Sequence, residues 1–357
     1  MLRIDRYLLR EMLMPLLVGL ATFVVMITGH MLFTVVDKIV EHGVGLPSVA
    51  KFMALQVPFA LLLSLPAASL LASSLALNRM ASENELTALR AGGVGFRRIL
   101  RPVLIIGLGA SLVALILAGT VVPAANHAAE TMLERMVAKQ PALAFRPGKF
   151  THTGGDLDFF AERVDRAQGV LGDLFVFMRV RGWDSPLLYH AATAHFTASG
   201  LTLGPADLHV LDPTGDCTWG EASGTEFNLG AFSFNPGMAV KNVTDLDFNE
   251  LWQQYRGAEQ ASPGAGRHFA VELDWRVSLA FSCLAFVLLA LPVTLSFARG
   301  QSLVGVLATL LVVFVYYVFM LWLRMLSENG PLPPLVGAWL ENAVIFLAAG
   351  VGLWRTR

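Results

Sequence analysis

Charged residues and cysteines are both scarce in this chain of 357 residues. Asp, Glu, Lys and Arg together make up 15% of it and apolar residues 55%, whereas soluble domains carry about 25% charged residues. This balance argues against an ordinary soluble domain. The two cysteines are Cys217 and Cys283, and the second lies inside a long apolar run. A disulfide between them is therefore not expected.

Nucleotide-binding and catalytic motifs are also missing. No Gly-x-x-x-x-Gly-Lys-Ser/Thr run occurs, so the chain builds no P-loop and would have to borrow ATP hydrolysis from a partner. Gly92-Gly-Val-Gly95 follows a predicted helix rather than a strand, which removes the context of a dinucleotide site. Neither His-Glu-x-x-His nor Gly-x-Ser-x-Gly is present, and the histidines lack metal-ligand spacing. We expect no catalytic residue, no metal, no cofactor in this chain and no nucleic-acid partner.

Six apolar runs dominate what is present. Crossing about 30 Å of hydrocarbon takes about 20 helical residues, and each run is long enough. Five of them contain no Asp, Glu, Lys or Arg, and the sixth contains one carboxylate, Glu341. The predicted spans are Met12–Val36, Phe52–Asn78, Pro102–Ala129, Val277–Ala298, Gln301–Leu323 and about Leu335–Trp354.

The basic residues predict the orientation, because Lys and Arg in short loops stay in the cytoplasm. Arginines gather before span 1, between spans 2 and 3, between spans 4 and 5, and after span 6. Both termini are therefore expected inside and the polar insert between spans 3 and 4 outside. A cleavable signal peptide is the competing interpretation of the N-terminus, but its apolar core has about 7–15 residues and the first run is longer.

The polar insert has the period-2 pattern of β-strands. Three short runs rich in β-forming residues are separated by Gly and Pro, which favours a sandwich or jelly roll. The predicted organisation is 1–129 for three spans, 130–270 for a β-jellyroll-like domain and 271–357 for three more spans. The predicted strands are Gly172–Arg179, His190–Thr197 and Asp207–Leu211, framed by helices at Ala128–Lys139 and Asp247–Arg256 and followed by a flexible return at Ala261–Arg267.

The loop between spans 2 and 3 predicts a short amphipathic helix at about 82–92. Ser82 and Glu85 have the spacing of a capping box. Leu86, Leu89 and Arg90 share one face, and Gly92-Gly93 ends the helix. The alternative is a charged loop that only sets topology.

This loop, Leu75–Pro102, resembles the LptF/LptG family of lipopolysaccharide-transport permeases, whose coupling helix contains Glu-Leu-Thr-x-Leu-Arg-Ala. The likeness covers nearly the whole chain. Its other parts are Arg6-Tyr-Leu-Leu-Arg-Glu11, Leu65-Pro-Ala-Ala-Ser-Leu-Leu71, Glu272-Leu-Asp-Trp-Arg276, Leu291-Pro292 and Leu332-Pro-Pro-Leu-Val-Gly-Ala-Trp339.

The resemblance implies an inner-membrane permease half that draws lipopolysaccharide from the outer leaflet. Its implied partners are an LptB-like ATPase dimer that binds ATP, a second LptF/LptG-type permease, and an LptC/LptA-like periplasmic bridge. The insert would then be periplasmic. Carried over to this chain, the residues that contact the ATPase are Glu83, Glu85, Leu86, Leu89 and Arg90.

Cations near the outer ends of the spans are candidates for binding lipid phosphates. These are Lys38, Arg276 and Arg324, and we expect Arg276 to point toward a cavity between spans 1 and 5. For each cation the alternative is a side chain that snorkels to head groups. Glu341, which stands where the family pattern has Pro, is expected to face Arg324 or Lys38.

A second function class remains open at this point. A membrane-anchored scaffold or sensor would use its β domain to bind a periplasmic protein without transport. A third possibility, an intramembrane enzyme, lacks paired catalytic residues. Copurification of an ATPase discriminates the transporter from the scaffold.

Overall fold

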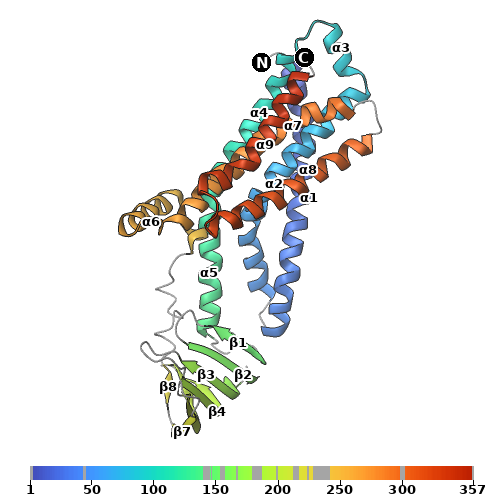
Figure 1. Ribbon diagram of the computed structural model, residues 1–357. Coiled ribbons are helices and arrows are strands. Elements are labelled where there is room, and N and C mark those ends of the chain that lie inside the picture. Colours follow the sequence, from blue (N-terminus) through green and yellow to red (C-terminus); the bar gives the residue numbers. More distant parts are fainter. Residues whose placement is uncertain are drawn as a thin grey trace. The chain divides into compact units, whose positions relative to one another are not determined.

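A computed structural model gives the fold of this chain (Figure 1). It describes residues 3–42, 46–139, 145, 147–152, 157–165, 168–178, 187–197, 200–211, 217–222, 225–227, 242–297 and 302–355. Within these residues, six helices are long and apolar enough to cross a membrane. An antiparallel β-sheet lies in the chain between the third and the fourth. The predicted fold class is confirmed.

The chain folds as two compact units. One comprises Met1–His127 with Lys241–Arg357, and the other is Ala128–Val240. The first unit therefore holds the membrane helices, except the last part of the third span, together with the chain that returns from the insert; the second holds the end of that span and the β-sheet. Each unit is described separately below.

The membrane unit is a helix bundle. The spans are α1 (Arg3–His42), α2 (Leu46–Ser82), α4 (Phe96–Ile116) continuing through a π-helical turn η1 (Leu117–Val121) into α5 (Val122–Lys139), α7 (Arg267–Phe297), α8 (Ser302–Glu328) and α9 (Pro334–Arg355). Helices are the expected form, because backbone groups in lipid must be satisfied within the segment.

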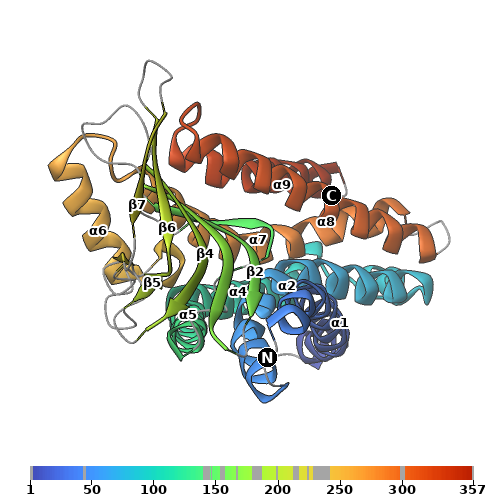
Figure 2. The same ribbon diagram turned by 90° about the horizontal axis from the view of Figure 1, so that it is seen from below.

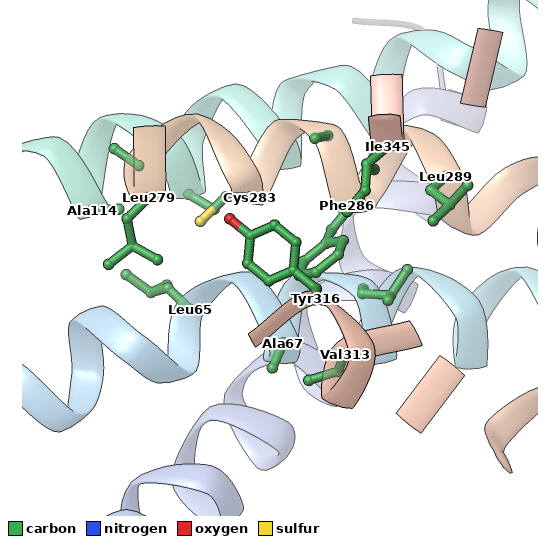
Figure 3. Close-up of a cluster of buried hydrophobic side chains, with 14 of the residues drawn as sticks. Leu65, Ala67, Ala114, Leu279, Cys283, Phe286, Leu289, Val313, Tyr316 and Ile345 are labelled. Carbon is green, nitrogen blue, oxygen red and sulfur yellow. The ribbon is translucent and has the colours of Figure 1, made fainter. Parts of the chain in front are cut away.

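Helices α2 and α7 form the centre of the bundle. They are the most buried spans, whereas only a minority of the residues in the apolar windows of α1, α8 and α9 are buried. Figure 3 shows part of this core, in which Phe286 of α7 meets Tyr316 of α8 edge to face at 4.7 Å between ring centroids. Small residues allow close approach of helices. Gly19 of α1 lies against Ala68 of α2, where an added Cβ would stand 3.8 Å from the Ala68 backbone.

Among its described residues, the second unit contains an eight-stranded antiparallel sheet. Its strands run in the order β1-β2-β3-β4-β5-β8, and β6 pairs with both β4 and β7. The three predicted strands correspond to β3, β4 and β6. The strands are β1 (Lys149–His152), β2 (Leu157–Asp165), β3 (Val170–Met178), β4 (Leu187–Phe196), β5 (Leu201–Leu203), β6 (Ala206–Leu211), β7 (Cys217–Ala222) and β8 (Glu226–Phe227).

Strand β4 is where the sheet divides (Figure 2). It pairs with β3 along one edge, while on the other edge its first half pairs with β6 and its last residues pair with β5. Successive side chains along each strand point to opposite faces of the sheet. Phe159, Leu174 and Val176 are fully buried on one of them. Phe160, Phe175 and their neighbours form a ladder of aromatic rings on the other.

The helices that frame the insert are present as predicted, but the return to the membrane is different. A single-turn 3-10 helix η4 (Val243–Asp245) precedes α6 (Phe248–Ala261), whose capping box joins Asp247 and Glu250. The flexible linker expected at Ala261–Arg267 is instead a hydrogen-bonded turn. Its bonds run from Ala265 N to Ser262 O at 3.1 Å and from Arg267 N to Gly264 O at 3.2 Å.

Candidate functional sites

The first candidate site is the short helix α3 (Glu85–Ala91), which joins the ends of α2 and α4. Helix α2 continues to Ser82, whose hydroxyl donates to the Arg79 carbonyl at 2.8 Å. The chain then turns at Asn84, which has φ +57°, a left-handed conformation that Asn tolerates better than most residues. The predicted Ser82–Glu85 capping box is therefore wrong, because Ser82 still belongs to the preceding helix.

Glycines end α3 as predicted. Gly93 has φ +79°, and the amide of Val94 donates to the carbonyl of Leu89 at 3.0 Å. This is the bond of a Schellman motif, which requires a left-handed residue of the kind that Gly supplies at no steric cost.

The inner face of α3 packs against the membrane bundle. Leu86 is 5% exposed and contacts Leu8, Met80 and Ile99, with Leu89 against the same cluster. These two leucines therefore hold α3 to α1, α2 and α4. Leu86 is buried by this packing, and Leu89 is partly buried. Their i, i+3 spacing was the sequence signal for this inner face.

Polar contacts tie the start of α3 to α1 and α2. The Tyr7 hydroxyl donates to both carboxylate oxygens of Glu85, at 3.1 and 3.0 Å. Arg79 donates from Nε to Glu83 at 3.1 Å and from Nη1 to Glu11. The hydrogen bond from Arg79 Nε to Glu83 holds the pKa of the Glu83 carboxyl below its ordinary value. Exposed pairs of this kind contribute little stability, so they orient α3 more than they secure it.

The outer face of α3 and of the turn before it is exposed. Among the residues whose side chains the structure describes, it is formed by Glu83 and Asn84, which precede the helix, and by Thr87, Ala88 and Ala91 within it. Of the five predicted ATPase-contacting residues, Glu83 lies on this surface and Glu85 lies at its edge. Arg90 lies in the helix, but its side chain is outside the described residues. The assignment of all five stays a prediction.

The second candidate site is a buried charged cluster near the start of α7. Arg276 is 3% exposed and Glu272 4%. Each of the guanidinium nitrogens of Arg276 donates to a protein acceptor. The acceptors are Glu272 Oε1 (2.8 Å), Leu246 O (2.6 Å), Ala118 O (3.4 Å), Thr244 O (2.9 Å) and Val243 O (3.2 Å).

These contacts join three segments of the membrane unit. They link α7 to the π-helical turn η1 and to the chain that enters α6. At the same place Gly119 of η1 lets the Phe248 ring come close, since an added Cβ would overlap that ring. Arg276 does not point toward spans 1 and 5, so the expected orientation is wrong. A role in binding phosphate stays a prediction, and this geometry favours a structural role.

Arg324 of α8 belongs to the same cluster. Its Nη2 donates to Glu272 at 2.8 Å and its Nε to Glu328 at 2.9 Å, and its guanidinium lies over the Trp275 ring, 4.6 Å from the centroid. Two carboxylates thus balance two guanidinium groups. These four side chains together carry no net charge, which weakens the case for Arg324 as a phosphate ligand. Lys38 lies in α1, but its side chain is outside the described residues.

Glu341 of α9 is buried at 2% exposure, and one of its carboxylate oxygens has no hydrogen-bond partner within the described part of the chain. Arg324 pairs with Glu272 and Glu328 instead, so the expected pairing of Glu341 with Arg324 is wrong. The alternative partner, Lys38, has a side chain outside the described residues. The neighbouring Asn342 donates to Ser278 O and Ser278 Oγ, both at 2.7 Å. No group of three or more His, Cys, Asp or Glu arranged for a metal occurs among the described residues.

Comparisons with known proteins agree with this architecture. The family model "Lipopolysaccharide export system permease LptF/LptG" matches residues 6–355. The chain is 23% identical to the lipopolysaccharide export system permease protein LptF of Escherichia coli (strain K12), over 99% of this chain and 95% of the relative. The protein of the same name from Shigella flexneri gives the same identity and coverage. The chain therefore belongs to the LptF/LptG family of lipopolysaccharide export permeases, as a multi-pass protein of the inner membrane.

Proposed function

We propose that this chain is one permease half of a lipopolysaccharide exporter, and that ATP is hydrolysed by a separate ATPase bound at α3. The family match over residues 6–355 carries this proposal. The chain contains no P-loop, so an active transporter needs an ATPase partner. A second permease of the same family would complete the membrane part, and both termini with α3 would lie in the cytoplasm.

The geometry of α3 supports an ATPase contact there. Its inner face is packed on the ends of α1, α2 and α4 through Leu86 and Leu89, while its outer face is exposed. A displacement of the outer face by a moving ATPase would therefore be passed to three spans through close packing rather than through a flexible loop.

Reversing a charge at α3 is expected to reduce ATPase binding. In Glu83→Lys a carboxylate on the exposed face becomes a cation, and like charges placed across an interface cost several kcal/mol. We expect at least a roughly tenfold loss of copurified ATPase, with normal membrane insertion. Glu85→Lys, which also loses the Tyr7 hydrogen bond, should have a similar effect. Glu162→Lys, at an exposed position of β2, is the control.

The outcome also separates the two function classes. ATPase that copurifies with wild-type protein and with Glu162→Lys, but not with Glu83→Lys, supports the transporter. If wild-type protein captures no ATPase from its own cells, the transporter proposal fails and a scaffold remains.

The β domain is proposed to pass lipid to an LptC/LptA-like bridge through an edge strand. Among the described strands β1 pairs with β2 alone, and backbone pairing at such an edge is a common mode of recognition. A photoreactive phenylalanine at Phe150, 55% exposed on β1, should crosslink to a periplasmic protein. The same substitution at Phe159, which is buried on β2, should not. Crosslinks from neither position in a functional complex would refute the edge contact.

A further inference from the structure

Helix α6 carries an exposed aromatic side chain that the transport proposal does not use. Trp252 is 47% exposed, although Leu251 beside it is fully buried. The Arg256 guanidinium lies over the indole ring, 4.9 Å from its centroid, and the Tyr255 ring is 5.6 Å away. The exposed part of α6 thus combines a large apolar ring with a cation.

The carboxylates near this ring are engaged in local backbone contacts. Asp247 accepts from the amide of Glu250, and Glu250 accepts in return from the amide of Asp247. Glu259 accepts from the amide of Gly264 in the following turn. Arg256 is exposed and lies beside Trp252. An aromatic ring with an adjacent cation matches the boundary between lipid acyl chains and anionic head groups.

The level of α6 along the bundle is fixed by its turn into α7. Gly266 lies so close to Tyr255 that an added Cβ would be 2.8 Å from its ring. Arg267, the next residue, donates from Nε to Ser327 O at the end of α8 at 2.6 Å, and from Nη2 to Leu332 O before α9. The end of α6, the start of α7 and the α8–α9 turn are therefore at one level. Figures 1 and 2 show α6 running across the direction of the spans there.

Tryptophans of α8 and α9 lie close to this level. Trp322 of α8 is 56% exposed and precedes Ser327 by five residues, which is about 8 Å along a helix. Trp339 of α9 follows Pro334 by five residues and packs on Phe281. Tryptophan gathers at the head-group level of membranes, and the polar layer on each side of the hydrocarbon is about 5–8 Å thick. Helix α6 thus lies within reach of that layer.

We propose that α6 is an interfacial helix that lies on the lipid surface, with Trp252 inserted at the acyl boundary and Arg256 at the head groups. A tethered helix needs little intrinsic affinity for lipid, because its effective concentration at the membrane is already high. The contact of α6 with lipid would position the neighbouring segments. Lipid contact at Trp252 would hold the depth of α7 and of the chain returning from the β domain.

Spin labels on the permease complex in lipid nanodiscs test this directly. Each variant carries one spin-labelled cysteine in place of Trp252, Arg256, Gln253 or Gln260. The native cysteines are removed by Cys217→Ser and Cys283→Ala. The relative accessibility to oxygen and to a water-soluble nickel chelate gives the depth of each label. We expect Trp252 to favour oxygen, at about 5–10 Å into the boundary, and the exposed Gln253 and Gln260 to favour the chelate.

The label at position 252 replaces the indole ring, and this loss could itself detach α6 from the lipid. The variant labelled at Arg256 keeps Trp252 and therefore tests the proposal independently. An intermediate depth there supports the proposal. If the labels at Trp252 and at Arg256 are each as accessible to the chelate as the label at Gln253, the helix lies in water and the proposal is wrong. Labels at these positions that are shielded from both probes overturn it in favour of a protein partner. None of these readings depends on the ATPase.

Discussion

Arg276→Ala is expected to destabilise the membrane unit strongly. The substitution removes every hydrogen bond that the guanidinium makes to η1, to the segment before α6 and to Glu272. Removing one member of a buried ion pair costs about 3–5 kcal/mol, because the partner charge and the polar groups around it are left buried. We expect thermal melting of the purified complex to fall by on the order of 10 °C.

A lysine at this position separates a structural role from phosphate binding. Lys keeps the positive charge but offers one ammonium group in place of a planar fork with five donors. It can pair with Glu272 but cannot reach all the carbonyl oxygens at once. If the role is structural, Arg276→Lys should melt well below wild type. If Arg276 binds lipid phosphate, Arg276→Lys should recover nearly normal amounts of lipopolysaccharide and melt normally.

Arg163→Ala is the control for loss of an arginine. Arg163 on β2 is mostly exposed and pairs with Asp173, and pairs of this kind contribute about 0–1 kcal/mol. Melting should change little. Wild-type melting in Arg276→Ala, together with a loss of bound lipopolysaccharide, would contradict the structural assignment and restore the phosphate assignment.

The contacts of Arg276 illustrate what sequence could and could not predict. Glu272 precedes Arg276 by four residues, and Glu328 follows Arg324 by four. This spacing places acid and base on one helix face, so both pairs were readable from the sequence. The backbone acceptors were not. Ala118 lies 158 residues earlier in the chain, and every residue has a carbonyl group, so nothing in the sequence marks the ones that Arg276 uses.

The spans were predictable for a different reason. Lipid accepts only segments whose backbone is satisfied internally and whose side chains are apolar, so about 20 or more uncharged residues determine a helix before any tertiary contact forms. Strands β3, β4 and β6 were visible through alternation. The end of α2 was not, because Ser82 is equally suited to cap a new helix or to close an old one, and the left-handed turn at Asn84 decides between them.

The second large effect is expected at Leu86. Helix α3 has seven residues, and isolated helices shorter than about 12–15 residues are marginal in water. The packing of Leu86 and Leu89 on the bundle is therefore what keeps α3 helical. Leu86→Glu buries a carboxylate among apolar side chains, which costs several kcal/mol unless the group moves out into water. We expect α3 to unfold from the bundle and ATPase recovery to fall to background.

Hydrogen exchange distinguishes loss of the helix from loss of a direct contact. The amides of Ala88 and Gly92 donate within this segment, each at 2.9 Å, to Asn84 O and Ala88 O. In Leu86→Glu both amides should lose protection while the spans keep theirs. Leu86→Met keeps the volume and apolar character of the side chain, so protection and ATPase recovery should stay near wild type. Unchanged protection in Leu86→Glu would mean that the polar contacts of Tyr7 and Arg79 suffice to hold α3. Leu86 and Leu89 would then not be needed to hold α3 on the bundle, and Glu85 rather than Leu86 would be the residue through which α3 moves the spans.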